Sequence, residues 1–397
     1  MMIMDFTYLK QFMDHMAAER TPGNAIEVYV KGKKVFQYAC GYSDLESQTP
    51  MTGEEYFNIY SCSKVTTVTA AAQLLERGKF LLSDPLYDYI PEFKDMSVKR
   101  VDGEVVQAKN QITIRDLFRM SAGFTYDLNA PGFQKARELT GGRMDTEQVI
   151  RCIASDPLSF EPGTHWQYSI CHDVLAGLVE IVSGMKFRDY VKKNLFEPLD
   201  MQNCAYHQTP EILSKMASQY AFVPYGQGGD FDLVEAQKCG NAKNGTFVNR
   251  TKKVSYVLGE EYDSGGAGIS ATISDYVKLL AALANMGLGL TGERILSGGT
   301  VELMRTNQLD ANMAKNFNWK QFIGYGYGLG VRTMIDRAIS GSNGSMGEFG
   351  WCGAAGAATL IDPERELAVC YAQHCLNPRE EYYFPRLRNV IYTCLDK

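Results

Sequence analysis

The sequence predicts an α+β fold in which the two ends of the chain build one antiparallel sheet. Residues 5–40 read as a helix followed by a β-hairpin, residues 80–255 read mostly as helices joined by polar loops, and residues 324–394 return to strands and a last helix. Elements that are segregated along the chain in this way are typical of α+β proteins. We therefore expect terminal helices to flank the sheet and a mostly helical domain to be inserted between its halves.

The N-terminal elements follow from the spacing of apolar residues. Residues 5–20 carry apolar side chains at helical intervals. Two β-prone runs, 26–30 and 35–39, surround the turn Lys31-Gly32-Lys33 and predict a hairpin. A further helix is predicted over 65–75.

The remaining elements are predicted from the same periodicities. Apolar residues at helical spacing indicate helices over 111–120, 173–182, 274–284 and 380–394, and β-prone runs indicate strands over 324–331, 354–361 and 366–372. Pro385 must lie in the first turn of the last helix or kink it. Residues 241–253 contain few apolar side chains and are expected to form an exposed loop. Together these elements predict a sheet domain over 1–60 and 257–397 and a helical domain over 61–256, with the ligand site in the cleft between them.

Composition and charge argue against several classes of protein. The 397 residues are 45% hydrophobic and carry a net charge of −6, whereas nucleic-acid-binding proteins normally present a basic face. No run approaches the roughly 18 apolar residues of a membrane-spanning helix. Met1 to Arg20 lacks the features of a secretory signal. We expect a cytoplasmic protein without nucleic-acid or membrane partners.

The cysteines do not predict a disulfide framework or a metal site. There are ten, they are scattered, and no C-x-x-C occurs. The adjacent pairs Cys171-His172 and His374-Cys375 are poor metal ligands because neighbouring side chains point in different directions. We therefore expect free thiols and no metal.

The residues that predict chemistry begin with an S-x-x-K sequence, Ser61 to Lys64, at the start of a predicted helix. Side chains three positions apart lie on one helix face, so the amine can act as a base for the hydroxyl once burial or charge lowers its pKa from about 10.4. The unpaired backbone N–H groups of a first helical turn also favour an oxyanion. Ser63 lacks this spacing, and Cys62 has no histidine nearby in sequence to activate it.

Further segments occur in a characteristic order. They are Met120-Ser121-Ala122-Gly123, Glu161-Pro162-Gly163 followed by Tyr168-Ser169-Ile170, Gly265-Gly266-Ala267-Gly268, and Trp351-Cys352-Gly353-Ala354. Together with S-x-x-K, one of the marks of β-lactamases and penicillin-binding proteins, they make residues 20–375 resemble the serine β-lactamase and penicillin-binding-protein superfamily. The match resembles most the class C-like branch of family VIII carboxylesterases and related acyltransferases. The resemblance implies a β-lactamase/transpeptidase-like fold.

The resemblance also implies roles for individual residues. Ser61 matches the nucleophile, Lys64 its paired amine, and Tyr168 the tyrosine of the family's Y-x-N motif, with the choice of base between Lys64 and Tyr168 left open. The backbone N–H groups of Ser61 and Ala354 are expected to form the oxyanion hole. Residues expected to contact substrate are Tyr126, Ile170, Trp351 and Gly353.

Two departures from the family pattern point to neutral or apolar acyl substrates. Ile170 replaces the asparagine of Y-x-N, and Trp351-Cys352 replaces the Lys-Thr pair that would bind a carboxylate. Trp351 is expected to form an aromatic pocket wall, although a core position is the alternative. The run Gly265 to Gly268 lacks the phosphate-loop signature and is expected to be a turn. A Ser-His-Asp triad using His165 or His172 is the mechanistic rival, but no G-x-S-x-G elbow occurs.

These observations predict a serine hydrolase of the carboxylesterase type that forms an acyl-enzyme on a small-molecule ester, with no cofactor. An acyltransferase using the same acyl-enzyme is the first alternative. A D-amino-acid peptidase or weak β-lactamase is the second, and an inactive binding domain is the non-enzyme alternative. The natural substrate and the oligomeric state are not readable from the sequence.

Overall fold

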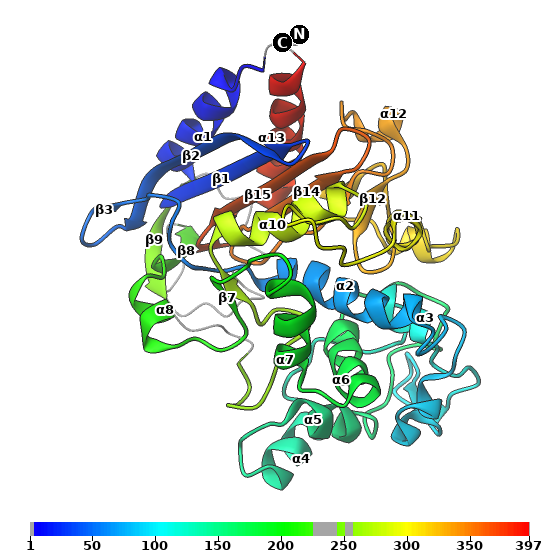
Figure 1. The fold of residues 1–397 in the computed structure, drawn as a ribbon. Coiled ribbons are helices and arrows are strands. Elements are labelled where there is room, and N and C mark those ends of the chain that lie inside the picture. The colour runs from blue at the N-terminus through cyan, green and yellow to red at the C-terminus, as the bar shows by residue number, and fades with distance from the viewer. Residues whose placement is uncertain (1–3, 225–243, 251–256, 397) are drawn as a thin grey trace.

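Strands from both ends of the chain form one eight-stranded sheet in the computed structural model, which describes residues 4–224, 244–250 and 257–396 (Figure 1). The strand order is β11-β12-β13-β14-β15-β1-β2-β3. The strands are β1 (Gly23–Val30), β2 (Lys33–Asp44), β3 (Thr49–Pro50), β11 (Tyr325–Tyr327), β12 (Arg332–Met334), β13 (Phe349–Gly350), β14 (Ala358–Asp362) and β15 (Leu367–Gln373). The predicted α+β class and the sharing of one sheet by both termini are confirmed.

The junction between the two ends lies at the centre of this sheet. β1 pairs antiparallel with β15 from Asn24 opposite Gln373 to Val30 opposite Leu367, and with β2 on its other edge. All seven residues of β15 are buried, and β1 is buried over its first six. β-Branched and aromatic residues suit strands that are covered on both faces.

Helices cover both faces of the sheet. The terminal helices α1 (Thr7–Glu19) and α13 (Glu380–Leu395) pack side by side on one face, and α10 (Ile273–Ala284) lies on the other (Figure 1). The backbone N–H of Asp5 donates to the carbonyl of Cys394 at 3.0 Å, so the two ends of the chain meet. Pro385 lies inside α13, in its second turn.

The helical region lies below the sheet in Figure 1, and α2 runs along the boundary between the two. Its helices are α2 (Ser63–Glu76), α3 (Ile114–Phe118), α4 (Pro131–Leu139), α5 (Thr146–Ile153), α6 (Cys171–Ser183), α7 (Phe187–Val191) and α8 (Pro210–Ser214), and α11 (Gly298–Arg305) and α12 (Arg337–Ser340) follow in the C-terminal part. Short helical turns are η1 (Tyr60–Cys62), η2 (Leu86–Asp88), η3 (Pro91–Phe93), η4 (Lys192–Phe196, a π-helix), η5 (Met313–Lys315) and η6 (Lys320–Phe322). Helix α2 contacts α6, so the S-x-x-K sequence at the start of α2 lies near the Tyr168-Ser169-Ile170 segment that precedes α6.

Three small sheets complete the described structure. They contain β4 (Phe57–Asn58), β10 (Ser270–Ala271) and β7 (Cys204–Ala205); β16 (Cys375–Leu376), β8 (Gln219–Pro224) and β9 (Gly245–Arg250); and β5 (Ser97–Lys99) with β6 (Val105–Gln107). The first two sheets join segments of the predicted helical domain to segments of the predicted sheet domain. The domain boundaries themselves remain a prediction.

The structure corrects three predicted elements. Residues 245–250 were expected to be part of an exposed loop, but they form a strand because Phe247 packs on Phe222 of the neighbouring strand. The ends of the predicted loop, 241–243 and 251–253, lie outside the described residues. The expected strand 324–331 instead contributes one strand of a hairpin, because the chain turns at Gly330, which has φ +80°. The helix expected over 111–120 is only five residues long.

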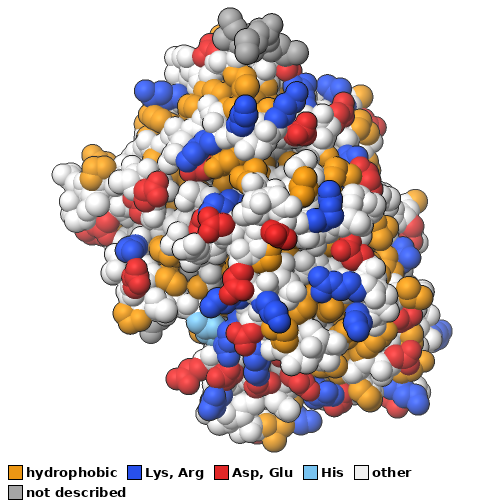
Figure 2. Space-filling model, viewed as in Figure 1, with side chains coloured by type: hydrophobic (Ala, Val, Ile, Leu, Met, Phe, Trp, Pro, Cys, Tyr) orange, Lys and Arg blue, Asp and Glu red, His pale blue; other side chains and the backbone are white. Residues whose placement is uncertain are grey.

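The structure bears on three expectations from the composition, which concern surface charge, membrane-spanning helices and cysteines. On the face drawn in Figure 2, acidic and basic side chains are interspersed rather than gathered by sign. Among the described residues, no helix is long and apolar enough to cross a membrane. The nine cysteines that the structure describes are all free, which confirms the prediction of thiols for this part of the chain.

Candidate active site

Ser61 lies in a tight turn that leads directly into α2. It is the middle residue of the 3₁₀ turn Tyr60–Cys62, and α2 begins two residues later. Tyr60 has φ +43°, a left-handed conformation that non-glycine residues rarely adopt and that is often found at functional sites. The turn leaves Ser61 partly exposed while its neighbours on both sides are buried.

Lys64 lies one turn further along and faces Ser61, as the S-x-x-K spacing predicts. Its Nζ is 3.2 Å from the Ser61 Oγ, 2.8 Å from the Tyr126 hydroxyl and 2.7 Å from the carbonyl oxygen of Gly266. The side chain is fully buried. Burial lowers the pKa of Lys64 to about 7, although the nearby Asp173 carboxylate opposes this effect. A neutral amine is therefore accessible beside the serine hydroxyl near neutral pH.

Asp173, in the first turn of α6, fixes the loop that supplies the Gly266 carbonyl. Its Oδ1 accepts hydrogen bonds from the Tyr262 hydroxyl at 2.9 Å and the Ser264 hydroxyl at 2.8 Å, and the Gly266 N–H points at the same oxygen from 3.4 Å. A Cβ on Gly266 would stand 2.6 Å from the other Asp173 oxygen and 3.0 Å from the Tyr126 hydroxyl, so only glycine fits this position. The loop is thus held tightly against the lysine.

Tyr168 presents its ring face to the lysine and its hydroxyl to Trp351. The Lys64 Nζ lies 4.6 Å from the Tyr168 ring centroid. The Trp351 Nε1–H donates to the Tyr168 hydroxyl at 3.0 Å, and the two rings stack with centroids 5.6 Å apart. This contact fixes the direction of the phenol.

The structure places Trp351 differently from the expected pocket wall. The side chain is only 1% exposed, because it sits among the rings of Trp319, Phe322 and Tyr327 as well as Tyr168. The alternative core position is therefore the one observed. Ile170 is also buried, at 5% exposure, so it offers little surface to a ligand. Tyr126 and Tyr168 are partly exposed rings beside the lysine, and the partly exposed Trp319, which the sequence reading missed, packs against Tyr168.

The loop after Trp351 packs directly on the turn that carries Ser61. A Cβ on Gly353 would stand 2.2 Å from the Ile59 carbonyl oxygen, which explains the glycine. Ala354 packs against the cluster that contains Tyr60. The loop that carries Ala354 therefore lies against the turn that carries Ser61, and the pairing of their N–H groups in an oxyanion hole stays a prediction.

The rival nucleophiles and bases are occupied elsewhere. Cys62 is buried with its Sγ directed at the Trp351 carbonyl, and burial raises the pKa of its thiol. The Ser63 hydroxyl accepts from the Ile269 N–H. His172 bonds the Phe118 carbonyl, and burial lowers its pKa to about 3, while the exposed His165 bonds its neighbour Thr164. These contacts disfavour a Ser-His-Asp triad.

The Lys64 contact with Gly266 was not anticipated. Residues 265–268 are predicted only as a turn, and no feature of the sequence links them or Asp173 to the lysine. The one available signal was the Gly265-Gly266 pair, since a Cβ at either position would collide with α6. Within the described residues, no group of three or more His, Cys, Asp or Glu side chains is placed to hold a metal ion.

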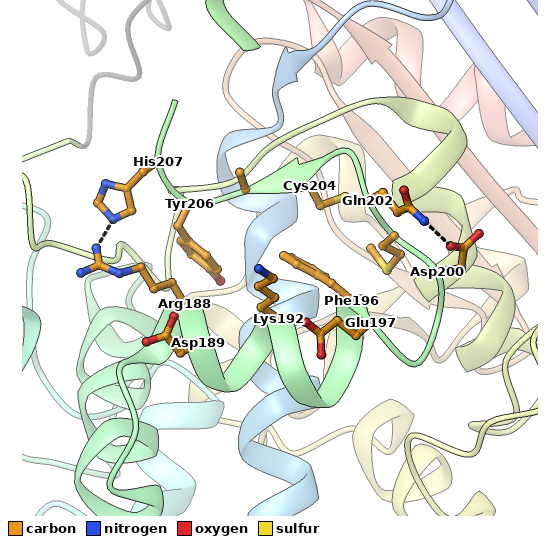
Figure 3. Close-up of a pocket in the computed structure, with 12 residues that line it drawn as sticks. Arg188, Asp189, Lys192, Phe196, Glu197, Asp200, Gln202, Cys204, Tyr206 and His207 are labelled. Carbon is orange, nitrogen blue, oxygen red and sulfur yellow. Dashed lines mark hydrogen bonds between the residues drawn. The ribbon is translucent and has the colours of Figure 1, made fainter. Parts of the chain in front are cut away.

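A cavity of about 590 Å³ lies apart from these residues (Figure 3). Phe196, Met201 and Tyr206 give it apolar walls, and Arg188, which bonds His207, stands at one end. None of the predicted catalytic side chains lines it. It adjoins the loop that carries Gly266, because Tyr206 packs against Gly268.

The sheet built from both chain ends and the helical region beside it form a β-lactamase/transpeptidase-like fold. Two solved structures share this fold: EstCE1, a hydrolase with promiscuous acyltransferase activity (TM-score 0.75, 23% identity, 97% of each chain covered), and the simvastatin synthase LovD from Aspergillus terreus (TM-score 0.77, 20% identity, 98% of each chain covered).

A family model described as Beta-lactamase matches residues 9–389, so the chain belongs to the β-lactamase family, a family of serine hydrolases. Among curated proteins, the chain is similar to esterase EstB from Burkholderia gladioli, with 26% identity over 374 residues that cover 91% of this chain and 88% of EstB. The family resemblance stated from the motifs is confirmed.

Proposed function

We propose that this protein is a carboxylesterase that forms an acyl-enzyme on Ser61. The observation that carries the proposal is the buried Lys64 amine, 3.2 Å from the Ser61 hydroxyl and with a pKa lowered to about 7. An amine in that state can accept the serine proton as the hydroxyl attacks an ester carbonyl.

The remaining groups supply the other parts of the reaction. The N–H groups of Ser61 and Ala354 stabilise the oxyanion that forms on the carbonyl oxygen. Because the Trp351 Nε1–H can only donate, the Tyr168 oxygen accepts from it and keeps its own proton as a donor. Tyr168 delivers that proton to the departing alcohol and regains one from the Lys64 ammonium. Water then attacks the acyl-serine, which releases the acid and restores the serine hydroxyl.

Neutral esters are the substrate class that the site favours. The position of the Lys-Thr pair is occupied by Trp351 and Cys352, both buried and neither cationic. The partly exposed rings of Tyr126, Tyr168 and Trp319 offer an aromatic surface to an acyl or alcohol group. The similarity to EstB supports the same reading.

The proposal is tested with p-nitrophenyl butyrate and intact-protein mass spectrometry. The wild-type protein is expected to release a burst of p-nitrophenol and to gain the mass of a butyryl group on the peptide that contains Ser61. Ser61→Ala is expected to lose both signals, whereas Cys62→Ala, which removes the adjacent thiol, is expected to keep them. Full activity in Ser61→Ala, or acylation that requires Cys62, would contradict the proposal.

Acyl transfer is the second candidate, since the names of the two structural neighbours include an acyltransferase activity and a synthase. The same acyl-enzyme serves both reactions, and the acceptor decides between them. Adding an alcohol acceptor to the butyrate assay separates the two: a new ester that outpaces butyric acid identifies a transferase. Benzylpenicillin is expected to be a poor substrate, and turnover equal to that of simple esters would support the β-lactamase alternative.

A further inference from the structure

Lys64 has three hydrogen-bond partners, and they are not equivalent. The Gly266 carbonyl and the Tyr126 hydroxyl are 2.7 and 2.8 Å from Nζ, whereas the Ser61 hydroxyl is 3.2 Å away. A charged lysine has three N–H groups and can donate to all three oxygens. When it loses one proton, two N–H groups and one lone pair remain, and their distribution decides whether the amine is a base for Ser61.

The Gly266 carbonyl fixes what the Lys64 amine presents toward one of its three partners. A carbonyl oxygen can only accept, so one N–H always points at Gly266. The lone pair is left to face either Tyr126 or Ser61. The Lys64–Tyr126 contact of 2.8 Å lies well within the usual N–H···O range, whereas the Lys64–Ser61 contact of 3.2 Å lies at its long end, so the second N–H is better placed for Tyr126.

We propose that Tyr126 is a positioning residue that accepts a hydrogen bond from Lys64 and thereby directs the lysine lone pair at Ser61. This inference rests on the proposed function and assigns Lys64, rather than Tyr168, as the base for acylation. Tyr126 undergoes no covalent change. The Ser61 proton moves to Nζ as the Oγ–acyl bond forms, and it leaves Nζ again through Tyr168 as the alcohol departs.

The surroundings of Tyr126 support an orienting role. Its hydroxyl would stand 3.0 Å from a Cβ on Gly266, so the phenol and the 264–268 loop are packed against each other beside the amine. The Tyr168 ring centroid lies 4.6 Å from Nζ, and a ring face favours the cation, whereas Tyr126 meets Nζ with its hydroxyl. The titratable groups that face Lys64 from the neighbouring elements are Cys62, Cys171, His172, Asp173 and Cys352.

Tyr126→Phe removes the acceptor and keeps the ring. The ammonium form has more N–H groups than the neutral form, so the loss of an acceptor destabilises the ammonium and moves the Lys64 pKa down. We expect the burst rate with p-nitrophenyl butyrate to fall 10- to 100-fold, KM to change less than threefold, and the acid limb of the pH profile to move to lower pH. Tyr56→Phe, whose hydroxyl bonds Asn203 away from this site, is the matched control.

A direct titration makes the result independent of turnover. With lysine labelled with ¹³C at Cε, the Lys64 signal is assigned by its loss in Lys64→Arg and followed from pH 5 to 10 in wild type, Tyr126→Phe and Tyr126→Leu. A lower Lys64 pKa in either folded Tyr126 variant supports the inference. An unchanged or higher pKa, or a raised KM with an unchanged burst rate, overturns it and leaves Tyr126 as a substrate contact. If the wild-type protein forms no acyl adduct on Ser61, the proposed function is overturned. The Lys64 titration would still decide the role of Tyr126 in that case.

Discussion

Lys64 is buried, and the proposed mechanism requires it to change its charge; these two properties are connected. Removal of the amine from water disfavours the ammonium form and lowers the pKa to about 7. Asp173 acts in the opposite direction, and its carboxylate is in turn stabilised by the Tyr262 and Ser264 hydroxyls. The lysine is therefore balanced between its two charge states near neutral pH.

The pH dependence of acylation is the first prediction at this scale. In the proposed mechanism the base is the neutral amine, which is populated above the Lys64 pKa, so the burst rate is expected to rise with pH through about 7 and then level off. Stopped-flow release of p-nitrophenol from pH 5 to 9 measures this. A profile that is flat over that range, or one that rises only above pH 8 and is still rising at pH 9, would show that an unperturbed or different group is the base.

Trp351 gives a second prediction, because its indole N–H holds Tyr168. Trp351→Phe keeps an aromatic ring and removes the donor, and the loss of one hydrogen bond is expected to slow acylation about tenfold with little change in KM. Trp166→Phe is the matched control. Trp166 also stacks on Tyr168, and among the described residues its Nε1 has no partner. Equal effects of the two substitutions would show that Tyr168 is positioned by packing alone.

At the scale of elements, close contacts between segments explain several glycines. The turn between β11 and β12 passes directly over α2 and α6. A Cβ on Gly330 would stand 2.2 Å from the Val68 side chain and 2.8 Å from the His172 ring, and Gly330 also has φ +80°. The hairpin is thereby pressed against the helix that carries Lys64, which links the packing of the sheet to the site.

Gly330→Ala is therefore expected to destabilise the protein by several kcal/mol. Gly341→Ala is the control, since Gly341 has a similar φ of +64° but nothing within 4 Å of its Cβ position. The backbone strain common to both is about 1 kcal/mol, and overpacking adds roughly 1–3 kcal/mol at Gly330 only. Urea unfolding of both variants measures the difference. Equal midpoints would mean that the hairpin moves away from α2 at little cost.

At the scale of the whole molecule, the sheet requires both ends of the chain. β1 lies between β15 and β2, so neither end can complete the sheet alone. The ends also meet, as the Asp5 to Cys394 hydrogen bond shows. A covalent link between the regions of Asp5 and Cys394 is therefore compatible with the fold, whereas a break within β1 is not.

Circular permutation tests this directly. A permutant of this sequence in which a linker joins the segments before α1 and after α13, and which has new ends between Asp102 and Gly103 in the exposed turn between β5 and β6, is expected to fold and to acylate Ser61. A permutant opened between Val28 and Tyr29, inside β1, is expected not to fold, because it breaks a buried strand with partners on both edges. Circular dichroism and the mass of the acyl-enzyme report the two outcomes. Folding of both permutants would show that the central strand assembles without an intact backbone.

Much of the fold was predictable because its signals are local. Helical spacing of apolar residues predicted α1, α2, α6, α10 and α13, and β-prone runs predicted β1, β2, β14 and β15. The prediction failed where an element depends on a distant partner. β9 is a strand because β8 offers it an edge and Phe222 a surface, and nothing within residues 245–250 shows either.

The candidate site shows the same difference between features that local sequence predicts and features that depend on distant residues. The S-x-x-K spacing is enough to predict that Ser61 and Lys64 face each other, since positions three apart on a helix turn share a face whatever surrounds them. The groups that surround the amine come from distant parts of the chain and depend on how the elements pack. Tyr126 and Gly266 reach Lys64 across 62 and 202 positions of sequence, and Trp351 reaches Tyr168 across 183. Burial, and hydrogen bonds between residues so far apart in sequence, arise when whole elements pack together. These interactions set the charge state of Lys64 and the direction in which its amine points.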